Sequence, residues 1–400
     1  MSPDIVVTSM SMSTSVAGDI DAGWKSLLNG ESGIDVLDED WLIEYDLPVR
    51  IGGRLAVSPT RFLSRVEIRR MSLAMQLAVV LGRELWRNAG TPEIDPRRLG
   101  VCVGTSLGGL DALTRAADAL RTGGKVTPLA VTLSMANGPS TAVGLELRAG
   151  AGVTAAVSGA EAIAAAWRMI AFGDADAVVA GGVDLPIDPV PFAAFSNLRT
   201  LSRRNHDPRA ASRPFDRDRD GLVLGEAGAM MMLESEDHAL ARGATIHGRL
   251  LGIGVTADTH HLVAPDPQGR GLSRAMTRAI ETSGLVPGDI HHVNAAAAGT
   301  RIGDPSEALA ILQALGNTHP PVYAPKSALG HTLGAAGAVE AVLTVLSIRD
   351  SIIPPTLNLE HPDVDLDIVH GDARRGAIDY ALTNSVDLGG HNVSLTFGRQ

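Results

Sequence analysis

The sequence has little cysteine, few aromatic residues and no excess of positive charge. Cys102 is the only cysteine among 400 residues, and aromatic side chains make up 3% of the chain. A single cysteine excludes an internal disulfide framework and a cysteine-rich zinc site. The formal net charge of -11 at pH 7 argues against nucleic acid or an anionic membrane as a partner.

Long apolar runs are also missing. No uncharged apolar stretch reaches the roughly 18 residues of a membrane span. The first residues, Met1-Ser2-Pro3-Asp4, do not form the basic region and apolar run of a signal peptide. We therefore expect a cytoplasmic protein without membrane contact. A chain of 400 residues exceeds the size of one hydrophobic core, so we expect two subdomains or a duplicated architecture.

Short apolar runs alternate with helical patterns along the chain. The runs lack strict polar alternation, as is typical of strands covered on both faces. They are Asp4–Thr8, Leu99–Gly104, Ala175–Gly181, His292–Ala296 and Tyr380–Asn384. The expected helices are Arg69–Ala89, Gly159–Phe172 and Gly334–Ile348. This alternation predicts a layered α/β architecture.

A faint internal repeat divides the sequence. Ser158-Gly159-Ala160 opens one apolar helix, and Gly330-His331 precedes another that starts with small residues. We expect an N-terminal half over residues 1–240 and a C-terminal half over residues 241–400, with the site between them.

Four groups of residues together carry a resemblance to a known family. They are Val103–Gly109, the charged segment Ser212–Gly228, Lys326–His331 and Gly389–Asn392. In this order and spacing, the chain resembles the elongating β-ketoacyl-acyl carrier protein synthases from about residue 5 to residue 398. The resemblance implies a thiolase-like fold, in which duplicated α-β-α-β-α layered halves contain mixed five-stranded sheets.

The reaction implied by the resemblance is a decarboxylative Claisen condensation. In the family, a cysteine at a helix N-terminus takes the acyl chain, because the helix end lowers its pKa and backbone N–H groups hold the oxyanion. Two histidines then assist loss of CO2 and stabilise the enolate, and a Gly-Phe-Gly-Gly turn gates the acyl pocket.

This chain departs from that machinery at three places. The cysteine position falls on Ala156, whose methyl group cannot form a thioester. The first histidine, which follows Val-Asn-Ala in the family, is Ala296. The gate carries Asp387 and Leu388 in place of Gly and Phe, and an acidic side chain there should hinder the turn. We expect no catalytic residues and no elongation by this chain alone.

Other members of the family's site are retained. His331 matches the second histidine, Lys326 precedes it at the usual spacing, and Glu307 matches an acidic residue of the family. We interpret these three as inherited structure, with a buried lysine paired to Glu307. We expect neither a metal site nor a resident cofactor, since phosphopantetheine arrives on the acyl carrier protein.

The leading functional hypothesis is a chain-length factor, the non-catalytic β-subunit of a type II polyketide synthase. Such a subunit pairs with an active ketosynthase as a heterodimer and shapes the acyl tunnel for polyketide or polyene synthesis. We expect Thr132, Leu133 and Met135 to contact the tunnel. The arginines at 203, 204 and 209 could meet an acidic carrier protein.

Two alternatives remain open. The chain could be a divergent carrier-dependent acyl enzyme that uses His331 as a base and Asp387 as an acid. It could also be a homodimeric pseudoenzyme that binds acyl chains or acyl carrier protein.

Overall fold

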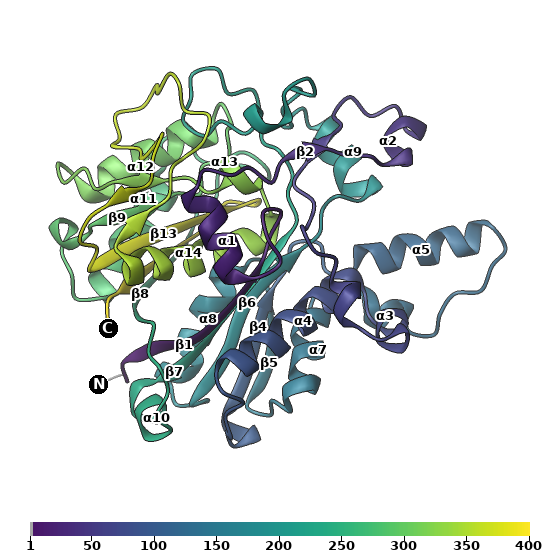
Figure 1. Cartoon of the computed structure of the whole chain (residues 1–400), viewed down its shortest axis with the longest axis horizontal. Helices are drawn as coiled ribbons and strands as arrows, with labels where there is room; N and C mark the ends of the chain where they lie inside the picture. Colours follow the sequence, from purple (N-terminus) through teal and green to yellow (C-terminus); the bar gives the residue numbers. More distant parts are fainter. Residues whose placement is uncertain (1–2) are drawn as a thin grey trace.

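The fold is built on one twisted ten-stranded sheet, seen in Figure 1. The computed structural model describes residues 3–400, and its strands follow the order β10-β9-β13-β14-β8-β1-β7-β6-β4-β5. Their bounds are β1 Ile5–Ser13, β4 Leu99–Gly104, β5 Gly152–Ala156, β6 Ala177–Asp184, β7 Ala227–Ser235, β8 Gly248–Ala257, β9 His292–Asn294, β10 Val322–Tyr323, β13 Tyr380–Asp387 and β14 His391–Gly398. Two small sheets pair β2 (Asp35–Val36) with β3 (Ile51–Gly52), and β11 (Ile352–Ile353) with β12 (Arg374–Arg375).

Each half of the sheet has the same connectivity. In the N-terminal half, β1, β7 and β6 are antiparallel neighbours, and β6, β4 and β5 are parallel. In the C-terminal half, β8, β14 and β13 repeat the antiparallel part, and β13, β9 and β10 repeat the parallel part. The halves join where β1 meets β8, at Val6 with Arg249 and Val7 with Gly248. The predicted fold, with duplicated halves and mixed five-stranded sheets, is confirmed.

Two buried helices lie at the centre of the layers. They are α8 (Gly159–Ala171) and α14 (Ala336–Asp350), and each contacts strands of both halves. They cross closely because glycines face alanines: a Cβ on Gly159 would lie 2.5 Å from that of Ala338, and one on Gly337 would lie 2.6 Å from that of Ala160. The reciprocal pattern makes this crossing the centre of the internal repeat.

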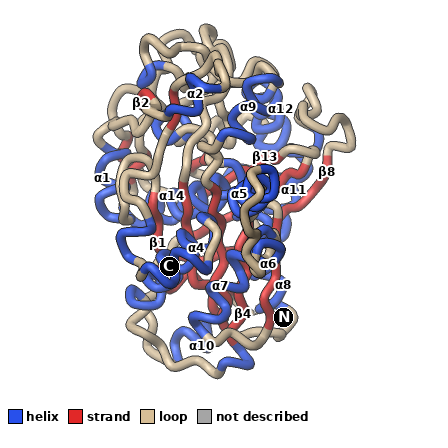
Figure 2. The backbone as a smooth tube through the Cα atoms, turned by 90° about the vertical axis from the view of Figure 1, so that its right-hand side faces the viewer, coloured by secondary structure: helices blue, strands red, loops and turns tan. Residues whose placement is uncertain are grey.

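Helices also cover the outer faces of the sheet, as Figures 1 and 2 show. On the N-terminal half, α4 (Leu73–Asn88) packs on β1, β7 and β6, and α7 (Gly138–Leu147) packs on β4 and β5. On the C-terminal half, α11 (Arg270–Thr282) packs on β8 and β14 and against α12 (Gly303–Leu315). The other helices are α1 Ile20–Leu28, α2 Asp40–Glu44, α3 Arg65–Arg70, α5 Leu110–Arg121, α6 Ala130–Ser134, α9 Pro189–Asn197, α10 Glu236–Ala241 and α13 Lys326–Leu329.

One expected helix was wrong in its extent. The segment 69–89 is not continuous, because α3 ends at Arg70 and α4 starts only at Leu73. Ser72 caps α4 by accepting a hydrogen bond from the Met75 N–H, so the chain turns at Met71 and Ser72. No helix between residues 3 and 400 combines the length and apolar character that a membrane span requires.

Candidate functional site

Ala156 lies at the junction of β5 and α8. It is the last residue of β5, and its carbonyl accepts a hydrogen bond from the Thr105 N–H at 3.1 Å. Ser158 then caps α8, and its hydroxyl accepts from the Glu161 N–H at 3.5 Å. The positive end of α8 would stabilise a thiolate beside it, but a methyl group offers no atom to ionise. Ala156 thus lies near the positive end of α8, at the position where the resemblance places the family's nucleophile.

Ala296 lies two residues after the end of β9, which spans His292–Asn294. Its backbone N–H donates to Glu307 Oε1 at 2.9 Å, and the Asn384 amide donates to the same oxygen at 3.1 Å. Burial raises the pKa of Glu307 to about 6, although these two hydrogen bonds oppose the shift. Glu307 on α12 thus holds the backbone turn at residue 296, where no imidazole is present.

Lys326 forms a buried ion pair with Glu340 and not with Glu307, which corrects the expected pairing. Its Nζ donates to Glu340 Oε1, from α13 to α14, and both side chains are buried. Burial raises the pKa of Glu340 to about 7, while Lys326 lowers it. Lys326 affects Glu307 only as a nearby charge, which lowers the pKa of Glu307.

His331 is held in one tautomer. Its Nδ1 accepts a hydrogen bond from the Leu333 N–H at 3.1 Å, so the neutral ring carries its proton on Nε2. Burial, and then the nearby Lys326, lower the pKa of His331 to about 3. The ring can donate from Nε2 to an oxygen, but gaining a proton would create a second cation near Lys326. This geometry favours a hydrogen-bond donor over the base of the alternative hypothesis.

The altered gate is an ordinary β-hairpin. β13 continues through Asp387, which pairs with His391 of β14, and the turn between them is Leu388-Gly389-Gly390. Both glycines have positive φ, at 85° and 78°, so the turn requires them. The Asp387 Oδ2 atom is buried and its carboxylate lies near Ser158, the cap of α8, whereas Leu388 is exposed.

Asp184 is a site residue that the sequence analysis missed. It ends β6, is fully buried, and its carboxylate accepts from the Thr105 hydroxyl and from the backbone of Ser106, Leu107 and Gly334. Burial raises its pKa to about 6 against these bonds. The Asp184 carboxylate thereby joins the glycine-rich loops of both halves. The only signal for Asp184 in the sequence was its position after an apolar run.

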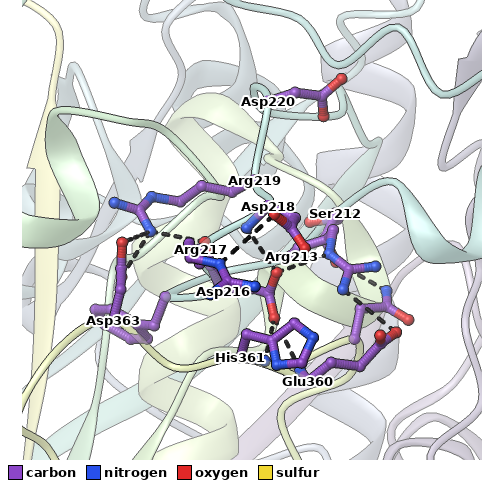
Figure 3. Close-up of polar contacts among 12 residues, drawn as sticks. Ser212, Arg213, Asp216, Arg217, Asp218, Arg219, Asp220, Glu360, His361 and Asp363 are labelled. Carbon is purple, nitrogen blue, oxygen red and sulfur yellow. Dashed lines mark hydrogen bonds and ion pairs between the residues drawn. The ribbon is translucent and has the colours of Figure 1, made fainter.

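An ion-pair cluster supports the site from the charged segment (Figure 3). Asp216 is fully buried and accepts from Arg213 Nε and from the Asp218, Glu360 and His361 N–H groups. Burial raises the pKa of Asp216, but the backbone bonds and Arg213 outweigh it and bring the pKa to about 2.

The same segment reaches Lys326 directly. The Ser212 hydroxyl donates to the Lys326 carbonyl at 2.6 Å, and Arg219 Nε donates to the Thr300 carbonyl at 2.9 Å. Arg219 also binds Asp363 through both carboxylate oxygens. The charged segment therefore braces Lys326 and the loop that follows Ala296.

The three expected tunnel residues do not share one environment. Leu133 is buried among Met75, Val79 and neighbouring residues of a satellite core. Met135 is 46% exposed, and Thr132 is also exposed. Only Thr132 and Met135 are thus available to line a tunnel completed by a second subunit.

Cys102 is an unreactive thiol. It is fully buried in β4, and burial raises its pKa to about 11. Between residues 3 and 400, no group of three or more His, Cys, Asp or Glu side chains is placed to hold a metal ion.

Comparisons with known proteins agree with this fold. The model of the β-ketoacyl synthase N-terminal domain matches residues 2–239, and that of the C-terminal domain matches residues 247–360. The chain belongs to the β-ketoacyl synthase family.

Named relatives and solved structures cover nearly the whole chain. The 3-oxoacyl-[acyl-carrier-protein] synthase 2 of Mycobacterium tuberculosis is 52% identical over 99% of this chain and 97% of the relative. That of a Synechocystis species is 38% identical over 98% and 97%. Among solved structures, a Burkholderia phymatum β-ketoacyl synthase (31% identity) and the ishigamide ketosynthase/chain length factor (28%) each have a TM-score of 0.92 and full coverage of both chains.

Proposed function

We propose that this chain is a non-condensing, chain-length-factor-like subunit that pairs with an active ketosynthase and shapes its acyl tunnel. The observation that carries the proposal is Ala156 at the start of α8, where acyl transfer needs a thiolate. Ala296 at the first histidine position supports it independently. The synthase names of its relatives describe condensation, for which these two positions leave no chemistry.

The exposed edge strand β5 supports the proposed pairing with a second subunit. β5 is the last strand of the ten-stranded order, and Val153 and Val157 in and after it are 37% and 44% exposed. Nearby, Leu145 at the end of α7 is 77% exposed and Val131 of α6 is 74% exposed. An exposed apolar edge strand is a template for pairing with another chain. A ketosynthase of the same fold could extend the sheet across this edge.

The carrier protein is the second proposed partner, and it brings the phosphopantetheine arm. Arg65, Arg69 and Arg70 of α3 are exposed, and none has a carboxylate partner within residues 3–400. By contrast, Arg204 and Arg209 are already paired with Asp220 and Asp35. On a chain of net charge -11, α3 is therefore the better surface for an acidic carrier.

Co-expression with a ketosynthase from the same gene neighbourhood tests the proposal. We expect a one-to-one complex by size exclusion with light scattering, and product formation that requires the partner's cysteine. Val153→Arg should break the complex by placing an unpaired charge in the interface, whereas Leu240→Arg, at a 60% exposed position on α10, should not. A stable homodimer that condenses malonyl and acyl thioesters unaided would overturn the proposal.

A further inference from the structure

Asp387 has no counterpart in the family's gate and is not satisfied by its surroundings. Its Oδ2 atom is buried and has no hydrogen-bond partner among the described residues. A buried carboxylate oxygen without a donor is costly unless a ligand or water meets it. Asp387 is therefore a candidate for chemistry that the resemblance does not supply.

The surroundings of Asp387 place it beside the former nucleophile position. The Ser158 hydroxyl, two residues after Ala156, lies against its carboxylate. α8, 13 residues long, starts there, and the N–H groups of its first turn have no acceptor within the helix. The Asp387 carboxylate therefore lies next to the positive N-terminal end of α8.

The opposite side of this turn offers a donor. His331 carries its proton on Nε2, because Nδ1 accepts from the Leu333 N–H. Lys326 connects the two sides, since it interacts with His331 and with Asp387. The thiol and the first imidazole that the resemblance implies are absent, because residues 156 and 296 are alanines.

We infer that this site hydrolyses acyl thioesters, with Asp387 as the general base that activates water. The inference rests on the proposed function, which brings carrier-bound acyl groups to this site. The water oxygen attacks the thioester carbonyl and its proton passes to Asp387. The carbonyl oxygen takes the negative charge and accepts from His331 Nε2–H. The carbon–sulfur bond then breaks, and Asp387 returns the proton to the departing thiolate, which leaves a carboxylic acid and a thiol.

The charges that face Asp387 set its dependence on pH. Burial raises its pKa, while the Ser158 hydroxyl, Lys326 and His391 lower it. Two carboxylates also act here: Glu161 of α8 raises the pKa of Asp387, and Asp387 in turn raises that of Glu340. A base must be ionised, so the hydrolysis rate should rise with pH and level off above the raised pKa.

The test uses hexanoyl-pantetheine thioester as the probe and the purified full chain. We expect thiol release, measured with a chromogenic disulfide reagent, and one 18O atom per product acid in 18O-water. Asp387→Asn should lower the rate about 100-fold or more, the range for loss of a general base. Asp387→Gly, which restores the family's residue, should do the same while the hairpin still forms.

Asp372→Asn is the matched control, because Asp372 is exposed and no hydrogen bond engages its side chain within residues 3–400. Thermal melting checks that each variant folds. No thiol release above the buffer rate, or full activity in both Asp387 variants, would overturn the inference. So would an acyl adduct on the chain by intact mass, since direct hydrolysis forms none. The assay needs no ketosynthase, so its failure and a failure of subunit pairing are separate results.

Discussion

At the scale of single residues, the two positions at which the resemblance predicts a loss of reacting atoms are held by backbone hydrogen bonds. Glu307 still binds the backbone of Ala296, and Thr105 still binds that of Ala156. Asp184 still joins the loops of both halves. The backbone at residues 156 and 296 is thus held by hydrogen bonds, and we propose that methyl groups replace the reacting groups at these two positions.

Replacing Ala156 alone tests whether the cysteine is the only missing part. We expect Ala156→Cys to remain inactive in condensation, because Ala296 and the Asp387 gate are unchanged, and loss of one member of a catalytic unit can cost about 10^4-fold. The measurement is product formation from acyl and malonyl thioesters, with intact mass to detect acylation.

A combined variant provides the comparison for that result. Ala156→Cys with Ala296→His, Asp387→Gly and Leu388→Phe restores the residues that the resemblance implies, and should gain measurable activity. Robust condensation by Ala156→Cys alone would show that neither residue 296 nor the gate limits the reaction.

At the scale of helices and strands, the sequence predicted best where the apolar pattern was buried on both faces. Leu99–Gly104 was predicted with its bounds correct, and α8 and α14 were located within two residues at each end. Five strands of the large sheet were missed, namely β5, β7, β8, β10 and β14. β7, Ala227–Ser235, contains consecutive methionines that give neither alternation nor a β-branched signal.

The site was predictable only as far as the motifs reached. Ala156, Ala296 and the gate follow from matched positions, but the pairing of Lys326 with Glu340 required the packing of α13 on α14. Glu307 and Glu340 both lie on helices, so the spacing of the sequence could not show which of them pairs with Lys326. Leu133 lies within α6 and is buried, whereas Met135 follows the end of α6 and is exposed, a difference that the sequence pattern did not show.

Larger side chains at residues 133 and 135 test whether these positions line the tunnel. We expect Met135→Trp, in the complex with a ketosynthase, to shorten the product without abolishing it, because a larger side chain fills space at this exposed position after α6. Leu133→Trp should instead destabilise the chain by about 1–3 kcal/mol, since it overfills a packed core. Product mass spectrometry and thermal melting separate the two effects, and unchanged product length with Met135→Trp would remove this residue from the tunnel.

At the scale of the whole molecule, the two halves are connected more closely by their central helices than by their sheet strands. The strands β1 and β8 share only two residue pairs, whereas α8 and α14 cross at close range in the interior. The connecting segment after α10 is on the surface, with Gly243 exposed at a φ of 70°. The interior crossing, and not the connection, is expected to hold the halves together.

Cutting the connection tests this arrangement. We expect a chain with a specific protease site inserted between Gly243 and Ala244 to stay in one piece on size exclusion after cleavage, because the helix crossing survives. Gly337→Leu in the cleaved chain should release the fragments, since its side chain would meet Ala160. Separation of the fragments without that substitution would mean that the covalent link is required.

The reciprocal glycine crossing also limits how this protein can diverge. Each glycine fits an alanine of the opposite half, so a bulkier residue in one helix cannot be accommodated without a smaller one in the other. Reacting groups at 156 and 296 lie outside this crossing and can be exchanged without disturbing it. Such a separation lets the chemistry of a duplicated protein disappear, or change, while its architecture stays fixed.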